Sequence, residues 1–291
     1  MPPLDPRAIV IMRRMAGEFA ERYADEFLLT HLKRLLGLPD AEKSTVASAL
    51  EDPFLALKAF FGHYAFARRG KDREDLAHGS LESMNRLVAD RSFEDVLEEP
   101  DGTSLWTAFD KYFQEKKLKS NEQQNRGPIQ GMLELAQEIH KIDNSLSLAT
   151  WVTAGATDTG RLEPQHLRIV DIRGVGPKSA STFVRDMVWL YDVEDDVDPA
   201  DRLFTQPVDR WLRNIVRYVV PEPGLEDPAD WIVAGKISKY TRRAQVSGIQ
   251  FNMGTTYFGQ RVVIDPNRFE DALRSLLVSE IERAKSTKPS D

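Results

Sequence analysis

The sequence predicts an all-α fold, and three observations lead to this prediction. Apolar residues recur at spacings of three and four along most of the 291 residues, which is the period of a buried helix face. Alternation with a period of two, which is typical of half-buried strands, is rare. Proline and glycine fall between the periodic segments, where they begin and end helices.

These signals place the helices along the chain. The pattern of residues 6–37 indicates one or two helices that end at Gly37-Leu38-Pro39. Asp52-Pro53 begins another helix, because aspartate caps a helix start and proline suits the first turn. An acidic stretch, 192–206, separates the last four helices from the rest. The remaining predicted helices cover 81–90, 103–117, 128–142, 145–154, 163–172, 178–191, 209–220, 228–234, 239–258 and 267–285.

The composition excludes several kinds of site. The chain has no cysteine, which excludes disulfides, iron–sulfur clusters, zinc–thiolate sites and cysteine nucleophiles. The five histidines are scattered, and no two of them have the spacing of metal ligands. We therefore expect no metal ion and no cofactor in the chemistry.

Charge and hydropathy bear on location and partners. The net charge of −7 argues against general affinity for nucleic acid, although Arg68, Arg69, Lys71 and Arg73 form a local basic cluster. No apolar run approaches the roughly 20 residues that cross a bilayer, and the N-terminus does not have the pattern of a secretory signal. We expect a monomeric cytoplasmic protein that does not bind membranes.

The most informative segment runs from Leu167 to Ala180 and contains Gly174-Val175-Gly176 between two predicted helices. Glycines allow a tight turn with positive φ, and Pro177 suits the first turn of the second helix. The unpaired N–H groups of such a turn and helix start can hold a phosphate. The candidate phosphate-binding residues are Arg173, Gly174, Val175, Gly176 and Ser179. The alternative is an ordinary pair of helices joined by a glycine turn.

The segment from Ile172 to Ala180 resembles the hairpin of the helix-hairpin-helix (HhH-GPD) DNA glycosylase superfamily. In the bifunctional branch of that superfamily, which includes endonuclease III and the 8-oxoguanine glycosylases, a lysine at this place is the nucleophile, and Lys178 matches it. Gln206 to Leu212 resembles the family's Pro-Val-Asp segment, whose essential aspartate matches Asp209. Residues 52–62 resemble the helix that opens the glycosylase domain.

The resemblance implies two helical subdomains with a DNA-binding cleft between them. We expect one subdomain to comprise 1–70 with 205–291, and the other to comprise 71–204 and carry the helix-hairpin-helix motif at about 165–191. The implied function is base-excision repair in the cytoplasm, at the nucleoid. A DNA glycosylase with abasic-site lyase activity would remove a damaged base, most plausibly an oxidised purine, from double-stranded DNA.

The chemistry of base excision suits the two matched residues. The reaction needs a nucleophile at the sugar C1′ and support for developing positive charge. An amine nucleophile must be deprotonated, and the partial positive charge of a helix N-terminus at Lys178 disfavours the ammonium form. Asp209, at another helix start, is expected to stabilise an oxocarbenium-like sugar and to assist proton transfer. The alternatives without a catalytic role are that Lys178 is an exposed lysine in a first turn and that Asp209 only caps a helix.

The sequence departs from the family in three places. Trp211 stands where a histidine often follows the aspartate, and the interval between Lys178 and Asp209 is long, as it is in archaeal 8-oxoguanine glycosylases. The iron–sulfur cysteines are absent. His63-Tyr64 stands where many members carry the polar residue that wedges into the gap left by the flipped base.

The damaged base would need a pocket with aromatic stacking and hydrogen bonds. The candidates for it are Trp189, Gln250, Phe251, Asn252 and Tyr257, although aromatic residues at helical spacing belong to a core more often than to a pocket. Two other functions stay open. One is a non-catalytic helix-hairpin-helix DNA-binding protein, and the other is a helical interaction protein in which the hairpin serves packing alone.

Overall fold

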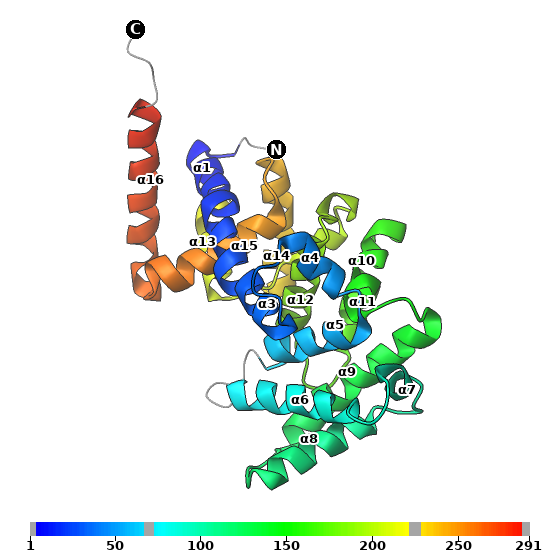
Figure 1. Cartoon of the computed structure of the whole chain (residues 1–291). Coiled ribbons are helices and arrows are strands. Elements are labelled where there is room, and N and C mark those ends of the chain that lie inside the picture. The colour runs from blue at the N-terminus through cyan, green and yellow to red at the C-terminus, as the bar shows by residue number, and fades with distance from the viewer. Residues whose placement is uncertain (1–3, 67–72, 221–227, 287–291) are drawn as a thin grey trace. The chain divides into compact units, whose positions relative to one another are not determined.

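Helices are the only regular elements in the computed structural model, which describes residues 4–66, 73–220 and 228–286 and the side chains of these as far as residue 279 (Figure 1). The prediction of an all-α fold is confirmed for these residues. Arg68, Arg69 and Lys71 of the basic cluster lie outside them. No helix in the described part is at once long enough and apolar enough to cross a membrane.

The chain divides into two compact units, which we describe separately. Unit 1 comprises residues 1–28 and 199–291, and unit 2 comprises 29–198. This division differs from the expected one at both boundaries: residues 29–70 group with unit 2 and not with the chain ends, and residues 199–204 group with unit 1. For residues 29–70 the reason is packing, because helices α3 (Thr30–Leu36) and α5 (Pro53–Ala59) and the π-helical turn η3 (Phe60–Tyr64) contact one another and the later helices of unit 2.

Unit 1 is built around helix α15 (Gly248–Tyr257), which packs against the turn η1 (Met15–Phe19) and helix α2 (Ala20–Tyr23). Phe251 and Met253 of α15 are fully buried in its core. The other elements of unit 1 are α1 (Pro6–Arg14), η6 (Asp201–Thr205), α13 (Arg210–Val219), α14 (Asp230–Arg243), η7 (Phe258–Val263), η8 (Pro266–Arg268) and α16 (Phe269–Ser286).

Several helix boundaries differ from the prediction, among them the starts of α6 (Arg73–Leu87) and α9 (Glu122–Ile142), and two of the differences have a clear local reason. The segment expected as one or two helices from residue 6 is interrupted at Gly17, which has non-helical φ and ψ of −94° and −114°. The helix expected over 239–258 is divided between α14 and α15. The chain turns at Gln245, whose φ is 56°, and Ser247 caps α15 by accepting a hydrogen bond from the Gln250 N–H at 3.0 Å.

Unit 2 is built around helix α12 (Pro177–Leu190), which packs against α10 (Leu148–Thr159), α11 (Glu163–Val170), α4 (Lys43–Ala49) and η3. Phe183 of α12 meets Phe60 and Tyr64 edge to face. Helix α6 (Arg73–Leu87) lies along α8 (Thr103–Glu115), which lies against α9 (Glu122–Ile142) (Figure 1). The remaining elements are α7 (Phe93–Leu97), η5 (Glu194–Asp196) and η2 (Ala24–Leu29), which runs across the boundary of the units. The sequence predicted neither α4 nor α7.

The core of unit 2 contains an ion pair between neighbours on α12. Arg185 and Asp186 are almost completely buried, and Nε of the arginine donates to Oδ1 of the aspartate at 2.8 Å. Burial raises the pKa of Asp186, and the guanidinium beside it opposes that rise. Removing one member of such a pair leaves a buried charge without a counter-ion, so we expect both residues to be needed for the stability of α12.

Candidate functional site

The turn between α11 and α12 is the centre of the candidate site. Val175 N–H donates to the Ile172 carbonyl at 2.9 Å, which closes the turn, and both side chains are buried. Gly174 has a φ of 92°, a conformation that a residue with a side chain rarely adopts. Arg173 and Gly174 are exposed. The turn is therefore anchored by two apolar side chains and presents its backbone to solvent.

Four backbone N–H groups at this turn have no hydrogen-bond partner in the part of the chain that the structure describes. They belong to Arg173, Gly174, Gly176 and Ser179. The first hydrogen bond within α12 runs from the Ala180 N–H to the Gly176 carbonyl at 3.1 Å, and Pro177 has no N–H to offer. Unpaired amides at the start of a 14-residue helix form a favourable place for an anion such as phosphate.

A buried histidine joins the two helices beside the turn. His166 of α11 lies with Nε2 3.0 Å from the Ser181 hydroxyl of α12. Burial lowers the pKa of His166, so that the ring is neutral in the folded protein at neutral pH. A neutral ring can donate from one nitrogen and accept at the other, which lets it fix the relative position of the two helices.

Helix α9 approaches the turn closely on one side. A Cβ atom on Gly127 would lie 2.4 Å from the Arg173 carbonyl oxygen, so only glycine allows this contact. Glu122, Arg126 and Arg168 line an open depression along this contact. The two arginines are paired there, Arg126 with Glu122 at 2.8 Å and Arg168 with Glu138 through two hydrogen bonds. Arg173 has no such partner among the described residues.

Lys178, the candidate nucleophile, is the second residue of α12 and is partly buried. Its carbonyl accepts a hydrogen bond from the Thr182 hydroxyl at 2.7 Å. The residue thus lies where the sequence places it, in the first turn of a helix, and it belongs to unit 2.

Asp209, the candidate carboxylate, belongs to unit 1 and is the N-cap of α13. Its Oδ1 accepts from the N–H groups of Trp211 and Leu212, both at 2.9 Å. The carboxylate is partly exposed, and Oδ2 accepts no hydrogen bond from a described residue. Asp209 therefore caps α13 through Oδ1, and this role leaves Oδ2 available for a contact with a substrate.

The segment before Asp209 is held by Asn252 of α15. Its side-chain amide lies 3.2 Å from Oε1 of Gln206 and 3.4 Å from the Pro207 carbonyl, and the side chain is buried. Asn252 was a candidate for reading a base edge. In the structure it holds the segment that leads to Asp209, and this contact between residues 45 and 46 positions apart could not be predicted from local sequence patterns.

The other candidates for a base pocket have little exposed surface. Phe251 lies in the core of unit 1, and Tyr257 is buried with its hydroxyl donating to Glu26 at 2.7 Å. Gln250 is partly exposed in the first turn of α15. Trp189, in unit 2, is also partly exposed, and the Lys43 ammonium lies 4.3 Å from the centre of its ring. The placement of Phe251 and Tyr257 therefore gives no support to a stacking role, because a base could reach them only if the core opened.

The two wedge candidates differ in accessibility. Tyr64 is buried between Phe60 and Phe183, where it cannot enter a DNA duplex without unpacking the core. His63 is mostly buried, and its ring lies 4.7 Å from that of His31. Burial lowers the pKa of His63 well below its ordinary value. Of the pair, only His63 reaches the surface.

The structure brings together one group of possible metal ligands that the sequence did not suggest. Glu94, Glu98 and His140 each place one ligand atom within 4.8 Å of the others. The two glutamates are four positions apart, but His140 is distant from them in the sequence. Only the contact between α7 and α9 makes them neighbours.

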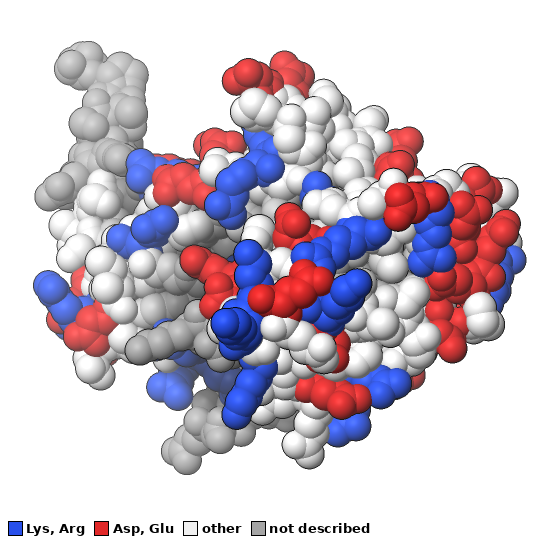
Figure 2. Space-filling view, turned by 60° about the horizontal axis from the view of Figure 1, so that its bottom comes forward, with Lys and Arg blue, Asp and Glu red and all other residues white. Residues whose placement is uncertain are grey.

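Basic and acidic side chains lie close to one another on the described surface. Figure 2 shows that basic and acidic side chains are interspersed over much of the face that it presents. The pairing of Arg126 and Arg168 with glutamates is an example of this arrangement. Non-specific attraction of a polyanion by such a surface is weak, so a phosphate contact would depend on the turn amides and on unpaired cations such as Arg173.

No protein-family model, no curated protein and no solved structure matches this chain.

Proposed function

We propose that this chain is a DNA glycosylase with abasic-site lyase activity. In this proposal, α11, α12 and the turn between them form a helix-hairpin-helix motif. The substrate is double-stranded DNA that contains an oxidised purine. The observation that carries the proposal is the turn, where the free N–H groups of Gly174, Gly176 and Ser179 adjoin Lys178. A phosphate on these amides, held also by Arg173, would bring the neighbouring sugar to the start of α12.

The proposed reaction uses the two matched residues in turn. The uncharged Nζ of Lys178 attacks C1′ of the damaged nucleotide, and the base leaves with the electron pair of the glycosidic bond and takes up a proton. Loss of a proton from the attached nitrogen and opening of the sugar ring then give a Schiff base, from which β-elimination breaks the strand. Asp209, through Oδ2, stabilises the positive charge on the sugar and relays protons. The two residues belong to different units, so their approach to one sugar is a part of the proposal.

Borohydride trapping tests this proposal. Borohydride reduces a Schiff base to a stable amine, so incubation with duplex DNA that contains 8-oxoguanine or an abasic site is expected to give a covalent protein–DNA adduct. The variant Lys178→Gln should give none and should still bind DNA, because the turn amides remain. Lys111→Gln, which removes an exposed lysine from α8 of the same unit, is the matched control and should be trapped as efficiently as the natural chain.

A second variant tests the carboxylate without disturbing the helix. Asparagine caps a helix about as well as aspartate, so Asp209→Asn keeps the start of α13 but removes the charge. We expect base excision to slow by roughly a hundredfold or more, measured as single-turnover release of the base. Full activity of this variant, or adduct formation by Lys178→Gln, would contradict the proposal.

Borohydride trapping also distinguishes the glycosylase from a second candidate function. The pairing of Arg126 and Arg168 with glutamates and the net charge of −7 favour a weakly binding, non-catalytic DNA module. Such a module would bind duplex DNA through the turn and would give no adduct with any substrate.

A further inference from the structure

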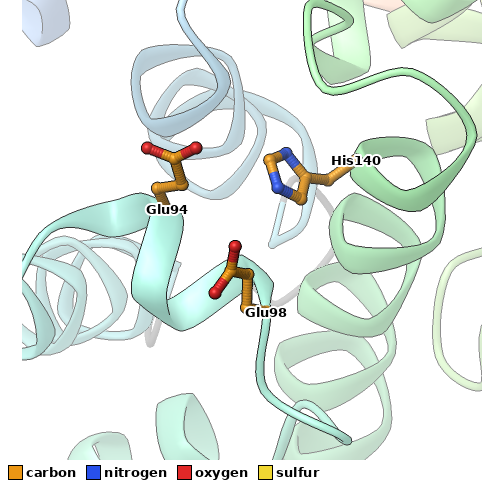
Figure 3. Close-up of side chains that lie close together, drawn as sticks. All are labelled: Glu94, Glu98 and His140. Atoms are coloured by element: carbon orange, nitrogen blue, oxygen red, sulfur yellow. The ribbon is translucent and has the colours of Figure 1, made fainter.

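Three side chains on the surface of unit 2 point toward one another from two helices, as Figure 3 shows. Glu94 is in the first turn of α7, Glu98 is the C-cap residue directly after α7, and His140 is in the last turn of α9. Residues four apart in a helix lie on the same side, so the two carboxylates form one edge of the group. One ligand atom of each residue lies within 4.8 Å of the other two.

These three side chains surround a space and do not bond to one another. Within the described residues, none of them makes a side-chain hydrogen bond or an ion pair. Two carboxylates are therefore close together without a paired cation, which is unfavourable by Coulomb's law. Nδ1 of His140 is also buried without a hydrogen-bond partner. A buried unpaired nitrogen costs free energy, and in a native structure it calls for an explanation such as a bound ion.

The spacing of the ligand atoms suits a single cation. At the greatest separation, a point equidistant from all three atoms would lie about 2.8 Å from each, and small rotations of the exposed glutamates would shorten this to the 2.0–2.2 Å of zinc ligands. A set of one imidazole and two carboxylates favours Zn²⁺ or a similar transition metal, whereas Mg²⁺ and Ca²⁺ prefer oxygen ligands alone.

We propose that Glu94, Glu98 and His140 bind one divalent transition-metal ion of the zinc type. Three protein ligands leave a position for water, and the adjoining depression contains Asp143 and Asn144, which offer further oxygen atoms. The ion joins α7 to the C-terminal end of α9. Since Gly127 at the other end of α9 contacts the turn, the ion lies about 20 Å along the helix from the proposed DNA site, and its role is structural.

The test is a zinc titration of the full chain after treatment with a chelator. Calorimetry should find one Zn²⁺ per chain, and Zn²⁺ but not Mg²⁺ should raise the melting temperature, because an ion that binds the folded state alone stabilises it. With Co²⁺ as the probe, visible absorption bands should appear that report the coordination of the metal.

Variants assign the ion to these residues. His140→Ala and Glu98→Gln should each weaken Zn²⁺ binding by at least about tenfold. Glu98 is exposed and glutamine has nearly its shape, so this variant should melt like the natural chain when no metal is present. His78→Ala removes another exposed imidazole from unit 2 and should leave binding unchanged. Absence of zinc binding by the natural chain, or undiminished binding by both ligand variants, would overturn the proposal.

Discussion

At the scale of single residues, a glycine of α9 decides how closely this helix approaches the turn. The backbone carbonyl oxygen of Arg173 lies 2.4 Å from the position where a Cβ on Gly127 would be. Helix interiors otherwise favour alanine over glycine by about 1 kcal/mol. The glycine is thus unfavourable for the helix alone and is required by the contact.

The variant Gly127→Ala should for this reason lower the free energy of unfolding by about 1–3 kcal/mol, because neither backbone can move away without a loss of packing. Gly235→Ala on α14 is the matched control. No atom lies within 4 Å of a Cβ at that position, so it should stabilise the protein by up to about 1 kcal/mol. Urea unfolding followed by circular dichroism measures both. Effects of the same sign would show that the close contact has no energetic consequence.

At the scale of elements, buried histidines hold the helices of unit 2. His166 joins α11 to α12, and His31 reaches the Gly62 carbonyl at 3.2 Å across the contact of α3 with η3. Burial lowers the pKa of His31, His63 and His166. The folded state therefore needs these rings to be neutral.

A pH dependence follows from these lowered pKa values. Between the unfolded value of about 6.5 and the lower folded values, the unfolded chain binds protons that the folded chain does not, so stability falls as the pH falls. Each buried histidine contributes a loss of up to about 1.4 kcal/mol per pH unit in this window. We expect His166→Gln to flatten the decrease as the pH falls below about 6.5, by at most one proton.

The measurement is urea unfolding at several pH values. The exposed residue His78 provides the control, since His78→Gln should leave the slope unchanged. A slope for His166→Gln equal to that of the natural chain would mean that this ring takes up its proton without unfolding.

At the scale of the whole molecule, the net charge of −7 and the pairing of basic with acidic residues limit the attraction of DNA. Affinity for DNA falls with salt by a slope of about −0.9 for each phosphate neutralised by a cation. If the proposed phosphate contact is made chiefly by backbone amides of the turn, with Arg173 as a cation that has no acidic partner among the described residues, a shallow slope is predicted.

Fluorescence anisotropy with labelled duplex DNA at increasing salt tests this expectation. Arg173→Ala should reduce the magnitude of the slope by about one, because it removes a cation that has no acidic partner among the residues that the structure describes. Arg168→Ala should change it little, since Glu138 already neutralises that guanidinium. An equal change in both variants would indicate that Arg173 has no special place in DNA binding.

Much of the local structure could be predicted because it depends on neighbours in the sequence. Asp52 and Asp209 cap helices, as their positions before proline or an apolar run predict. The positive φ of Gly174 and the start of α12 at Pro177 follow from turn and helix chemistry within a few residues. Short α7 was missed, because five residues carry too little periodicity to reveal a helix.

Two features of the sequence by themselves determined the local structure: the apolar spacing and the residues that begin and end helices. They predicted that the described chain is helical and placed the turn before Lys178, because such preferences act over a few residues. Only the tertiary structure decided that Phe251, Asn252 and Tyr64 are buried, that Gly127 contacts Arg173, and that His140 lies beside two glutamates that are distant in the sequence. These results depend on the packing of helices that are far apart in the chain, and a helical pattern shows which face is apolar but not which helix will cover it.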